Sequence, residues 1–322
     1  MFGAGAVGGH LAARLARGGA EVSVVARGAH LAAIRERGLR VEAKDGTLHA
    51  AVAASDDPAA LGPQEMVLVT VKAPALPAVA AGIGPLLGAK TPVVFVMNGI
   101  PWWYFHKTGG GQEGRRLPRI DPDDAVWRAV GPGRAIGGVV YSACTVIAPG
   151  VVEVETDRNR LVLGEPDGRL TPRVENLAEV LRAGGFAIDV TADIRTAIWA
   201  KLALNLVSGP LSVLSGHATR DAFAEPACRE AARVAQGEAL AIAAALGCRP
   251  DVDPEKMLAQ QGRLAHKASI LQDLELGRPM EVAALFEAPL ELARMAGVAT
   301  PMLDLLVALA RLRAKAAGLV GS

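Results

Sequence analysis

The chain has 322 residues, 51% of them hydrophobic, and a formal net charge of +1, which suits a globular protein of two domains. The near-neutral charge gives no electrostatic footprint for nucleic acid or for an anionic membrane surface. No charged leader with an apolar segment opens the sequence, and the apolar run 305–310 is too short to span a bilayer, so we expect a cytoplasmic protein. Cys144, Cys228 and Cys248 lie far apart without metal-ligand spacing, and we expect small core residues in a reducing compartment and no metal site.

The first motif is the glycine-rich stretch Gly3-Ala4-Gly5-Ala6-Val7-Gly8. In a G-x-G-x-x-G turn, the first glycine permits a tight turn, the second lets a pyrophosphate approach the backbone, and the third lets the helix pack on the sheet. Leu11 and Leu15 follow at helical spacing, and a strand pattern resumes at 21–25. A flexible terminus without a ligand is the alternative, but this context favours a dinucleotide site formed by Gly3, Gly5, Ala6, Val7 and Gly8.

Only Met1 and Phe2 precede the first glycine. A buried central strand usually has about five or six residues. We therefore expect a first strand that is nearly absent, at a cost in ladder hydrogen bonds and buried apolar contacts. A start assigned too late and a chain that lacks half of its central strand are the two explanations, and we favour the first.

Arg27 closes the second predicted strand, where the residue type selects the cofactor. An NAD site places an Asp or Glu there to accept from the ribose 2′-hydroxyl, whereas an NADP site uses Arg against the 2′-phosphate. The sequence therefore indicates NADPH, with an ordinary solvated arginine as the alternative.

Two further polar residues follow predicted buried strands. The apolar run 66–71 ends at Lys72, and the strand 92–96 is followed by Asn98 and Gly99. The carboxyl ends of parallel strands face the ligand crevice, so Lys72 and Asn98 are candidate ligand contacts. A surface lysine and an Asn-Gly turn are the alternatives.

A hairpin and an aromatic loop interrupt this pattern. Asp45-Gly46 lies between alternating segments at 39–43 and 47–52, and we expect an antiparallel excursion on the doubly wound sheet that carries no chemistry. The loop 100–105 contains Trp102 and Trp103, which could wall an apolar pocket or serve a subunit contact. We interpret 106–124 as an exposed excursion, with His106 as a surface residue.

The remaining elements define two domains. In the first we expect helices at 29–37 and 172–183 and strands at 135–141, 151–154, 161–163 and 186–190. After these the pattern is wholly helical, with helices at 194–207, 229–246, from 253, at 283–295 and at 303–316. The predicted fold is α/β, with an N-terminal Rossmann-type dinucleotide-binding domain at 1–190 followed by an all-α C-terminal domain at 191–322.

Lys201 and Asn205 stand one turn apart on a predicted helix, and hence on one face. Both are polar among Ala, Leu and Trp. A lysine on an apolar face beside a cleft can have its pKa lowered by desolvation and can then donate a proton near neutral pH. A helix-end lysine at a domain boundary is the alternative.

These residues carry a resemblance to the ketopantoate reductase family that spans almost the whole chain. It rests on the glycine turn with Arg27, on Lys72, Asn98-Gly99, the helix Trp199-x-Lys201-Leu202-x-x-Asn205, and Ser269-x-Leu271-Gln272-Asp273 followed by Glu281. The resemblance implies NADPH-dependent reduction of 2-dehydropantoate to (R)-pantoate. It also implies that Lys201 is the general acid, that Glu281 binds substrate and orients the lysine, and that Asn98, Asn205 and Ser269 hydrogen-bond the substrate.

Two departures from the family pattern concern the substrate. Gly209-Pro210 stands where the family usually has a second asparagine before a proline, and Ala283 stands where an acid usually follows the glutamate. A reductase of another, bulkier or more apolar, 2-oxo acid and a non-catalytic NADPH-binding protein therefore stay open. The expected partner is a small-molecule 2-oxo acid rather than nucleic acid or membrane, and a homodimer is the assembly we consider.

Overall fold

The computed structural model describes residues 1–156 and 159–319, which form two compact units. The first unit comprises residues 1–97 and 101–194, and the second comprises residues 98–100 and 195–322. The short segment 98–100 thus belongs to the helical second unit, although the chain on either side of it belongs to the first.

The first unit is built on a mainly parallel sheet. Its strands are β1 (Ser23–Val25), β4 (Ala53–Ser55), β5 (Val67–Val69), β6 (Val93–Val96), β7 (Ala135–Tyr141), β10 (Arg160–Gly164) and β11 (Ala187–Val190). β5, β6 and β7 pair in parallel, β10 pairs antiparallel with β7, and β11 pairs parallel with β10. β1 pairs parallel with β4, and Phe2 bridges β1 to β5. The predicted Rossmann-type α/β fold is confirmed.

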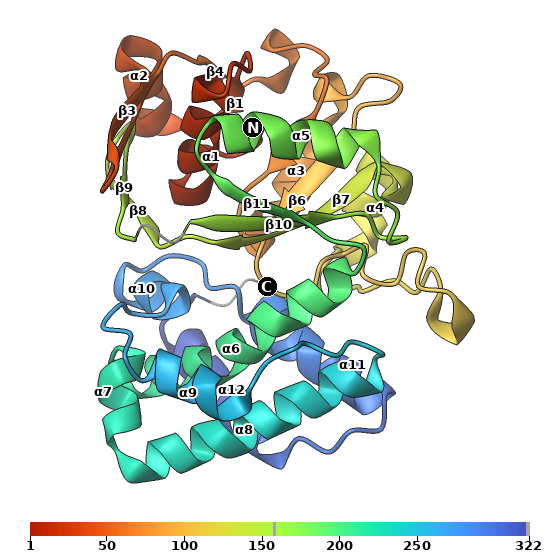
Figure 1. Ribbon diagram of the computed structural model, residues 1–322, viewed down its shortest axis with the longest axis vertical. Coiled ribbons are helices and arrows are strands. Elements are labelled where there is room, and N and C mark those ends of the chain that lie inside the picture. The colour runs from red at the N-terminus through yellow and green to blue at the C-terminus, as the bar shows by residue number, and fades with distance from the viewer. Residues whose placement is uncertain (157–158, 320–322) are drawn as a thin grey trace. The chain divides into compact units, whose positions relative to one another are not determined.

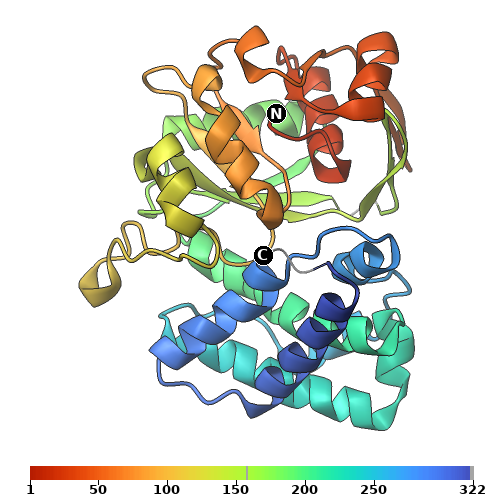
Figure 2. The ribbon, with the colours of Figure 1, turned by 180° about the vertical axis from the view of Figure 1, so that it is seen from behind.

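Helices cover both faces of this sheet (Figures 1 and 2). One face carries α1 (Ala6–Arg17) and α5 (Pro172–Ala183), and the other carries α3 (Leu76–Gly82) and α4 (Ala125–Val130). α2 (Gly28–Arg37) packs beside β4. Short 3-10 turns lie between these elements at η1 (Pro58–Ala60), η2 (Ala73–Ala75), η3 (Gly84–Leu86), η4 (Gly110–Gln112), η5 (Pro122–Asp124) and η6 (Pro132–Arg134).

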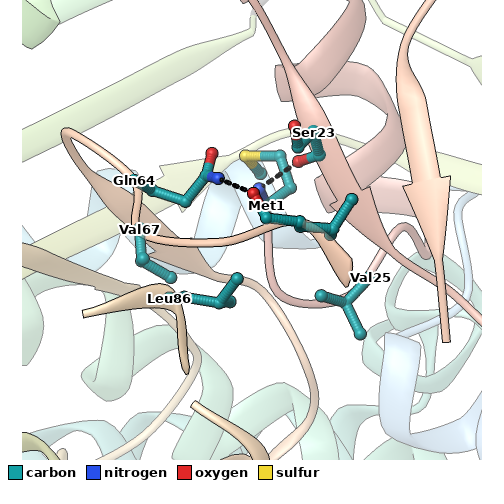
Figure 3. Close-up of a pocket in the computed structure, with 7 residues that line it drawn as sticks. Met1, Ser23, Val25, Gln64, Val67 and Leu86 are labelled. Carbon is teal, nitrogen blue, oxygen red and sulfur yellow. Dashed lines mark hydrogen bonds between the residues drawn. The ribbon is translucent and has the colours of Figure 1, made fainter. Parts of the chain in front are cut away.

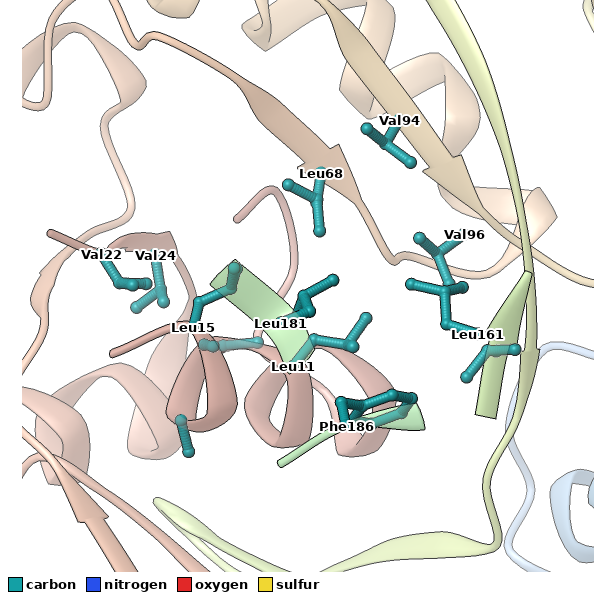
Figure 4. Packing of buried hydrophobic residues seen from close by; sticks show 14 of the residues in the cluster. Leu11, Leu15, Val22, Val24, Leu68, Val94, Val96, Leu161, Leu181 and Phe186 are labelled. Atoms are coloured by element: carbon teal, nitrogen blue, oxygen red, sulfur yellow. The ribbon is translucent and has the colours of Figure 1, made fainter. Parts of the chain in front are cut away.

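The core between α1 and the sheet confirms the helical spacing of Leu11 and Leu15. Figure 4 shows both side chains pointing from α1 toward residues of the sheet such as Leu68 and Val94. Leu11 is fully buried, and Leu15 is 7% exposed. This burial fixes the orientation of α1, and with it the direction of the amide groups at its first turn.

The predicted hairpin lies in a second sheet, so its placement on the doubly wound sheet was wrong. This sheet has the order β3-β2-β9-β8 and consists of β2 (Leu39–Ala43), β3 (Gly46–Ala50), β8 (Cys144–Ala148) and β9 (Val151–Val154). The parallel partner of β2 is β9, far along the chain, which a local pattern cannot reveal. The buried guanidinium of Arg14 on α1 bonds both carboxylate oxygens of Asp45 at 3.0 Å, and these bonds hold the pKa of Asp45 below its usual range.

Met1 and Phe2 replace a full central strand, as expected. Met1 O accepts a 2.8 Å hydrogen bond from Val25 N, and Phe2 N donates one of 2.7 Å to Leu68 O. The terminal amine of Met1 donates to Ser23 O at 2.6 Å, and burial lowers its pKa to about 5. Figure 3 shows the small hollow beside it, which is lined by Met1, Ser23, Val25, Leu61, Gln64, Val67 and Leu86.

The aromatic loop belongs to the core of the first unit, so neither predicted role holds. Trp102 and Trp103 are each 1% exposed. Trp102 packs edge-on against Phe95 of β6 and against Trp127 of α4. His106 is half-buried edge-on to Trp127 rather than on the surface.

The second unit is all helical, as predicted. Its helices are α6 (Ile194–Ser215), α7 (Thr219–Ala224), α8 (Pro226–Ala245), α9 (Pro254–Gln261), α10 (Ser269–Glu275), the π-type turn η7 (Ala283–Glu287), α11 (Ala288–Met295) and α12 (Pro301–Ala316). Asp253 caps α9 by accepting from Lys256 N, and the carboxylate of Glu238 caps α12 by accepting from two amides of its first turn.

α6 is longer than its predicted range of 194–207, because it continues through Pro210. Ser208 Oγ bonds back to Leu204 O at 2.9 Å beside this proline. Burial of Leu206 and Val207 provides the packing that outweighs the backbone hydrogen bond lost at the proline. By length and composition α6 could cross a membrane, but 61% of its apolar window is buried inside the protein, as in a core helix.

Candidate functional site

The glycine turn of the first unit has the geometry of an anion site. Gly3 has φ +100, and a Cβ on Gly8 would lie 2.1 Å from Gly3 O, so both positions require glycine. A Cβ on Gly5 would meet nothing within 4 Å, which leaves open space beside the turn. α1 begins at Ala6 with no acidic residue in its first turn, so its amide groups are suited to hold a phosphate.

The carbonyl groups of this turn already accept hydrogen bonds from the protein. Thr70 Oγ1 donates to Gly3 O at 2.7 Å, and the His30 ring bonds Ala4 O at 2.6 Å. Gly9 N donates to Gly5 O at 2.7 Å. With its carbonyls engaged, the turn presents amide donors rather than lone pairs to a ligand. A dinucleotide pyrophosphate would fit Gly3, Gly5, Ala6, Val7 and Gly8.

Arg27 and Lys72 occupy the positions expected for dinucleotide contacts. Arg27 is exposed and immediately precedes α2, just beyond the carboxyl end of β1. Lys72 is exposed just beyond β5. β1 and β5 flank Phe2, so both cations follow strands that border the glycine turn. Their roles toward a cofactor stay predictions.

In the second unit, Asn98 joins the two residues predicted to be catalytic. Lys201 Nζ donates a 2.7 Å hydrogen bond to Asn98 Oδ1, and Asn98 Nδ2 donates to Glu281 Oε2 at 3.5 Å. Lys201 and Asn98 are half-buried, whereas Glu281 is 4% exposed. The amide therefore holds the ammonium on one side and the carboxylate on the other.

The π-type turn η7 holds the segment that carries Asn98. Ile100 N donates to Ala284 O at 3.1 Å. Gly99 has φ +81, and a Cβ there would lie 2.3 Å from Ala284 O, so only glycine allows this approach. η7 begins two residues after Glu281, so one short region supplies the carboxylate and anchors the amide. Such π-type turns occur frequently at functional sites.

Asn205 and Ser269 stay outside this hydrogen-bonded group. Asn205 is half-buried one turn after Lys201, and Ser269 is the exposed first residue of α10. Among residues 1–156 and 159–319, neither side chain bonds Lys201 or Glu281. The side chains of Asn205 and Ser269 are therefore available to hydrogen-bond a substrate.

One turn beyond Asn205, the aromatic ring of Phe286 packs against α6 at Gly209. A Cβ on Gly209 would lie 2.8 Å from Phe286 of η7, and Phe286 is fully buried. Sequence reasoning noted Gly209 but missed Phe286, and it also missed His30. No periodicity distinguishes either residue, because each acts on a neighbour far away in the sequence.

No group of three or more His, Cys, Asp or Glu side chains in the described part of the chain could hold a metal ion. Of the three cysteines, Cys248 is buried, whereas Cys144 and Cys228 are half-buried rather than core residues.

A pyrophosphate-type glycine turn on a parallel sheet, and a lysine that an amide links to a buried carboxylate in a helical unit, are features typical of a dinucleotide-dependent oxidoreductase. The family model described as ketopantoate reductase PanE/ApbA matches residues 1–168, and that of its C-terminal part matches residues 193–314. The chain therefore belongs to the ketopantoate reductase family and is an oxidoreductase. Its cofactor class is a nicotinamide dinucleotide.

Individual proteins show the same likeness. The 2-dehydropantoate 2-reductase of Mesorhizobium japonicum is 44% identical over 97% of this chain and 96% of its own length. A Ralstonia solanacearum protein assigned as a ketopantoate reductase has a structure with TM-score 0.92 and 40% identity, covering 99% of this chain and 98% of that one. The 2-dehydropantoate 2-reductase of Geobacter metallireducens has TM-score 0.84 and 29% identity, covering 97% of this chain and 98% of that one.

Proposed function

We propose that the protein catalyses the NADPH-dependent reduction of a 2-oxo acid, 2-dehydropantoate to (R)-pantoate, with Lys201 as general acid. The observation that carries this proposal is the 2.7 Å hydrogen bond from Lys201 Nζ to Asn98, with Glu281 at the other end of the same amide. The name of the Mesorhizobium japonicum relative supports the substrate. We expect a cytoplasmic enzyme, with a homodimer as the candidate assembly.

The reaction adds a hydride and a proton to the ketone. Bound at the glycine turn with Arg27, NADPH would supply the hydride that adds to the carbonyl carbon. Negative charge then develops on the carbonyl oxygen, and Lys201 donates a proton to it, which gives the hydroxyl group of the product. A cationic donor stabilises that charge most in the transition state. Asn98 and Glu281 orient the ammonium, and the side chains of Asn205 and Ser269 are available to hydrogen-bond the substrate.

The choice of NADPH over NADH rests on Arg27. A guanidinium can form charge-assisted, paired hydrogen bonds to a 2′-phosphate, whereas a ribose 2′-hydroxyl calls for an acidic acceptor. The residue that stands beyond β1 is this arginine, and it is exposed. Lys72 is the second candidate contact to the cofactor, and Asn98 the third.

A reductase of another 2-oxo acid is the second candidate function, and the Gly209–Phe286 packing favours it. The ring fills the space where the family pattern places an asparagine side chain on the lysine face of α6. Gly209 therefore offers no second amide to a substrate on this face, which suits a 2-oxo acid without a hydroxyl group for such an amide to bind.

The test is oxidation of NADPH by the purified protein with 2-dehydropantoate and with 2-oxo acids of increasing tail size. General acid catalysis contributes on the order of 100-fold or more, so Lys201→Ala should lower kcat by at least that factor and keep NADPH binding. Lys256→Ala changes an exposed lysine on α9 and should leave both unchanged. Near-normal kcat in Lys201→Ala would refute Lys201 as the general acid, whereas NADPH binding without turnover of any of these 2-oxo acids by the wild type would support a non-catalytic NADPH-binding protein.

A further inference from the structure

His30 links the glycine turn to the second sheet of the first unit. It lies half-buried on α2, and each of its two ring nitrogens makes a hydrogen bond. Nε2 lies 2.6 Å from Ala4 O in the turn, and Nδ1 accepts a 3.0 Å bond from Gly150 N, between β8 and β9. A backbone N–H can only donate, so Nδ1 carries no proton and Nε2 is the donor to Ala4 O.

The bond to Ala4 O determines where the next amide points. Ala4 O and the N–H of Gly5 belong to one planar trans peptide, so they point in opposite directions. A donor that holds Ala4 O therefore also fixes the direction of the Gly5 N–H, which points away from His30 within the same plane. A Cβ on Gly5 would meet nothing within 4 Å, so there is open space beside this residue for a ligand. Thr70 fixes the preceding peptide in the same way through Gly3 O.

We infer that His30 is a positioning residue for cofactor binding, which aims the Gly5 amide at the pyrophosphate of the dinucleotide. This inference rests on the proposed binding of NADPH at the glycine turn. His30 would not contact the cofactor itself and would act on it only through the Ala4–Gly5 peptide. The Gly150 bond fixes the tautomer and the ring orientation, as outer partners do for histidine ligands at other sites.

Two substitutions separate the two bonds of His30. The amide nitrogen of a glutamine stands near the place of Nε2 and can still donate to Ala4 O. The amide oxygen of an asparagine stands near the place of Nδ1 and can still accept from Gly150 N, but its side chain is too short for Ala4 O. His30→Gln should therefore keep the affinity for NADPH within about twofold, whereas His30→Asn should lower it about tenfold, as expected for one lost hydrogen bond.

The experiment measures the dissociation constant of NADPH by calorimetry, the KM for NADPH, kcat, and the melting temperature of each variant without ligand. We expect His30→Asn to raise the dissociation constant and the KM together and to leave kcat at saturating NADPH nearly unchanged. Adenosine 2′-monophosphate, which has no pyrophosphate, should inhibit both variants and the wild type with similar inhibition constants. His49→Asn, an exposed histidine on β3, is the matched control and should change nothing.

The outcomes distinguish this inference from the proposed function. If the wild type does not bind NADPH, the proposed function fails. If the wild type binds NADPH and His30→Asn binds it equally well, only the role of His30 is overturned. The inference is also overturned if His30→Gln and His30→Asn lose NADPH affinity, adenosine 2′-monophosphate affinity and melting temperature to the same extent. That pattern would mean that His30 only supports the fold.

Discussion

Lys201 Nζ donates a 2.7 Å hydrogen bond to Oδ1 of Asn98, a residue 103 positions earlier in the chain. Sequence reasoning assigned Asn98 to ligand contact alone. The hydrogen bond adds a second role, because an ammonium held by an amide oxygen has a defined direction for its remaining protons. Asn98 is in turn held by Glu281 and by the docking of Ile100 on Ala284.

We expect Asn98→Ala to lower kcat about tenfold as well as to raise the substrate KM. The lysine loses one hydrogen bond that orients it in the transition state, and a loss near 1.4 kcal/mol corresponds to about that factor. Asn205→Ala is the matched control, since Asn205 lies outside the hydrogen-bonded group and should change mainly KM. Steady-state kinetics on the best substrate check this, and an unchanged kcat in Asn98→Ala would contradict it.

Arg27 is expected to decide between the two nicotinamide dinucleotides. NADPH should bind at least about tenfold more tightly than NADH, because a charge-assisted contact to the 2′-phosphate is worth about 1.4 kcal/mol or more. In Arg27→Ala this preference should disappear, while NADH affinity stays nearly constant. Titration of both cofactors on both proteins measures the effect, and equal affinities in the wild type would refute the assignment.

Gly209→Asn should lower the stability of the folded protein, whatever its effect on activity. Its Cβ would lie 2.8 Å from the buried ring of Phe286, and overpacking of this kind costs about 1–3 kcal/mol. We expect a lower melting temperature for Gly209→Asn and a partial recovery for Gly209→Asn combined with Phe286→Leu.

Activity of the double variant tests the substrate. If 2-dehydropantoate is the natural substrate, kcat/KM for it should rise relative to Phe286→Leu alone. A fall for 2-dehydropantoate, together with preference of the wild type for apolar 2-oxo acids, would favour the second candidate function.

The buried amine of Met1 predicts a dependence of stability on pH. Its pKa is lowered from 8.0 to about 5 in the folded protein, because burial disfavours the charged form. Between these values the unfolded chain binds a proton that the folded chain does not, so the free energy of unfolding rises with pH. This contribution is fully present above about pH 8 and is lost as the pH falls toward about 5.

Two upstream extensions isolate this effect. Ile-Val and Gly-Ser placed before Met1 both replace the amine by an amide, so both should reduce the slope of stability between pH 8 and pH 5. The apolar extension should also raise the melting temperature, because it can cover the hollow beside Val25 and Val67. Burial also lowers the pKa of His10, to about 4, but that contribution is common to all three proteins and cancels. Identical slopes in all three would contradict the role of Met1.

The local sequence determined the elements and their class. Glycine spacing, the apolar runs of β5 and β6, and the helical i,i+4 spacing of Leu11 and Leu15 each act within a few residues, and all of them appear in the structure. Family-specific motifs indicated Lys201, Glu281 and the ketopantoate reductase family. Glycine, proline and the alternation of apolar residues carry this information because backbone conformation and burial depend on near neighbours.

Tertiary packing decided the rest. It placed the 39–50 hairpin in a second sheet with β9, buried Trp102 and Trp103 in the core, extended α6 through Pro210, and set Phe286 against Gly209. It also brought Asn98 to Lys201 and His30 to Ala4. Each of these depends on which distant surfaces meet, because burial and hydrogen bonding between remote segments are set by the packing of the whole unit and leave no period in the chain.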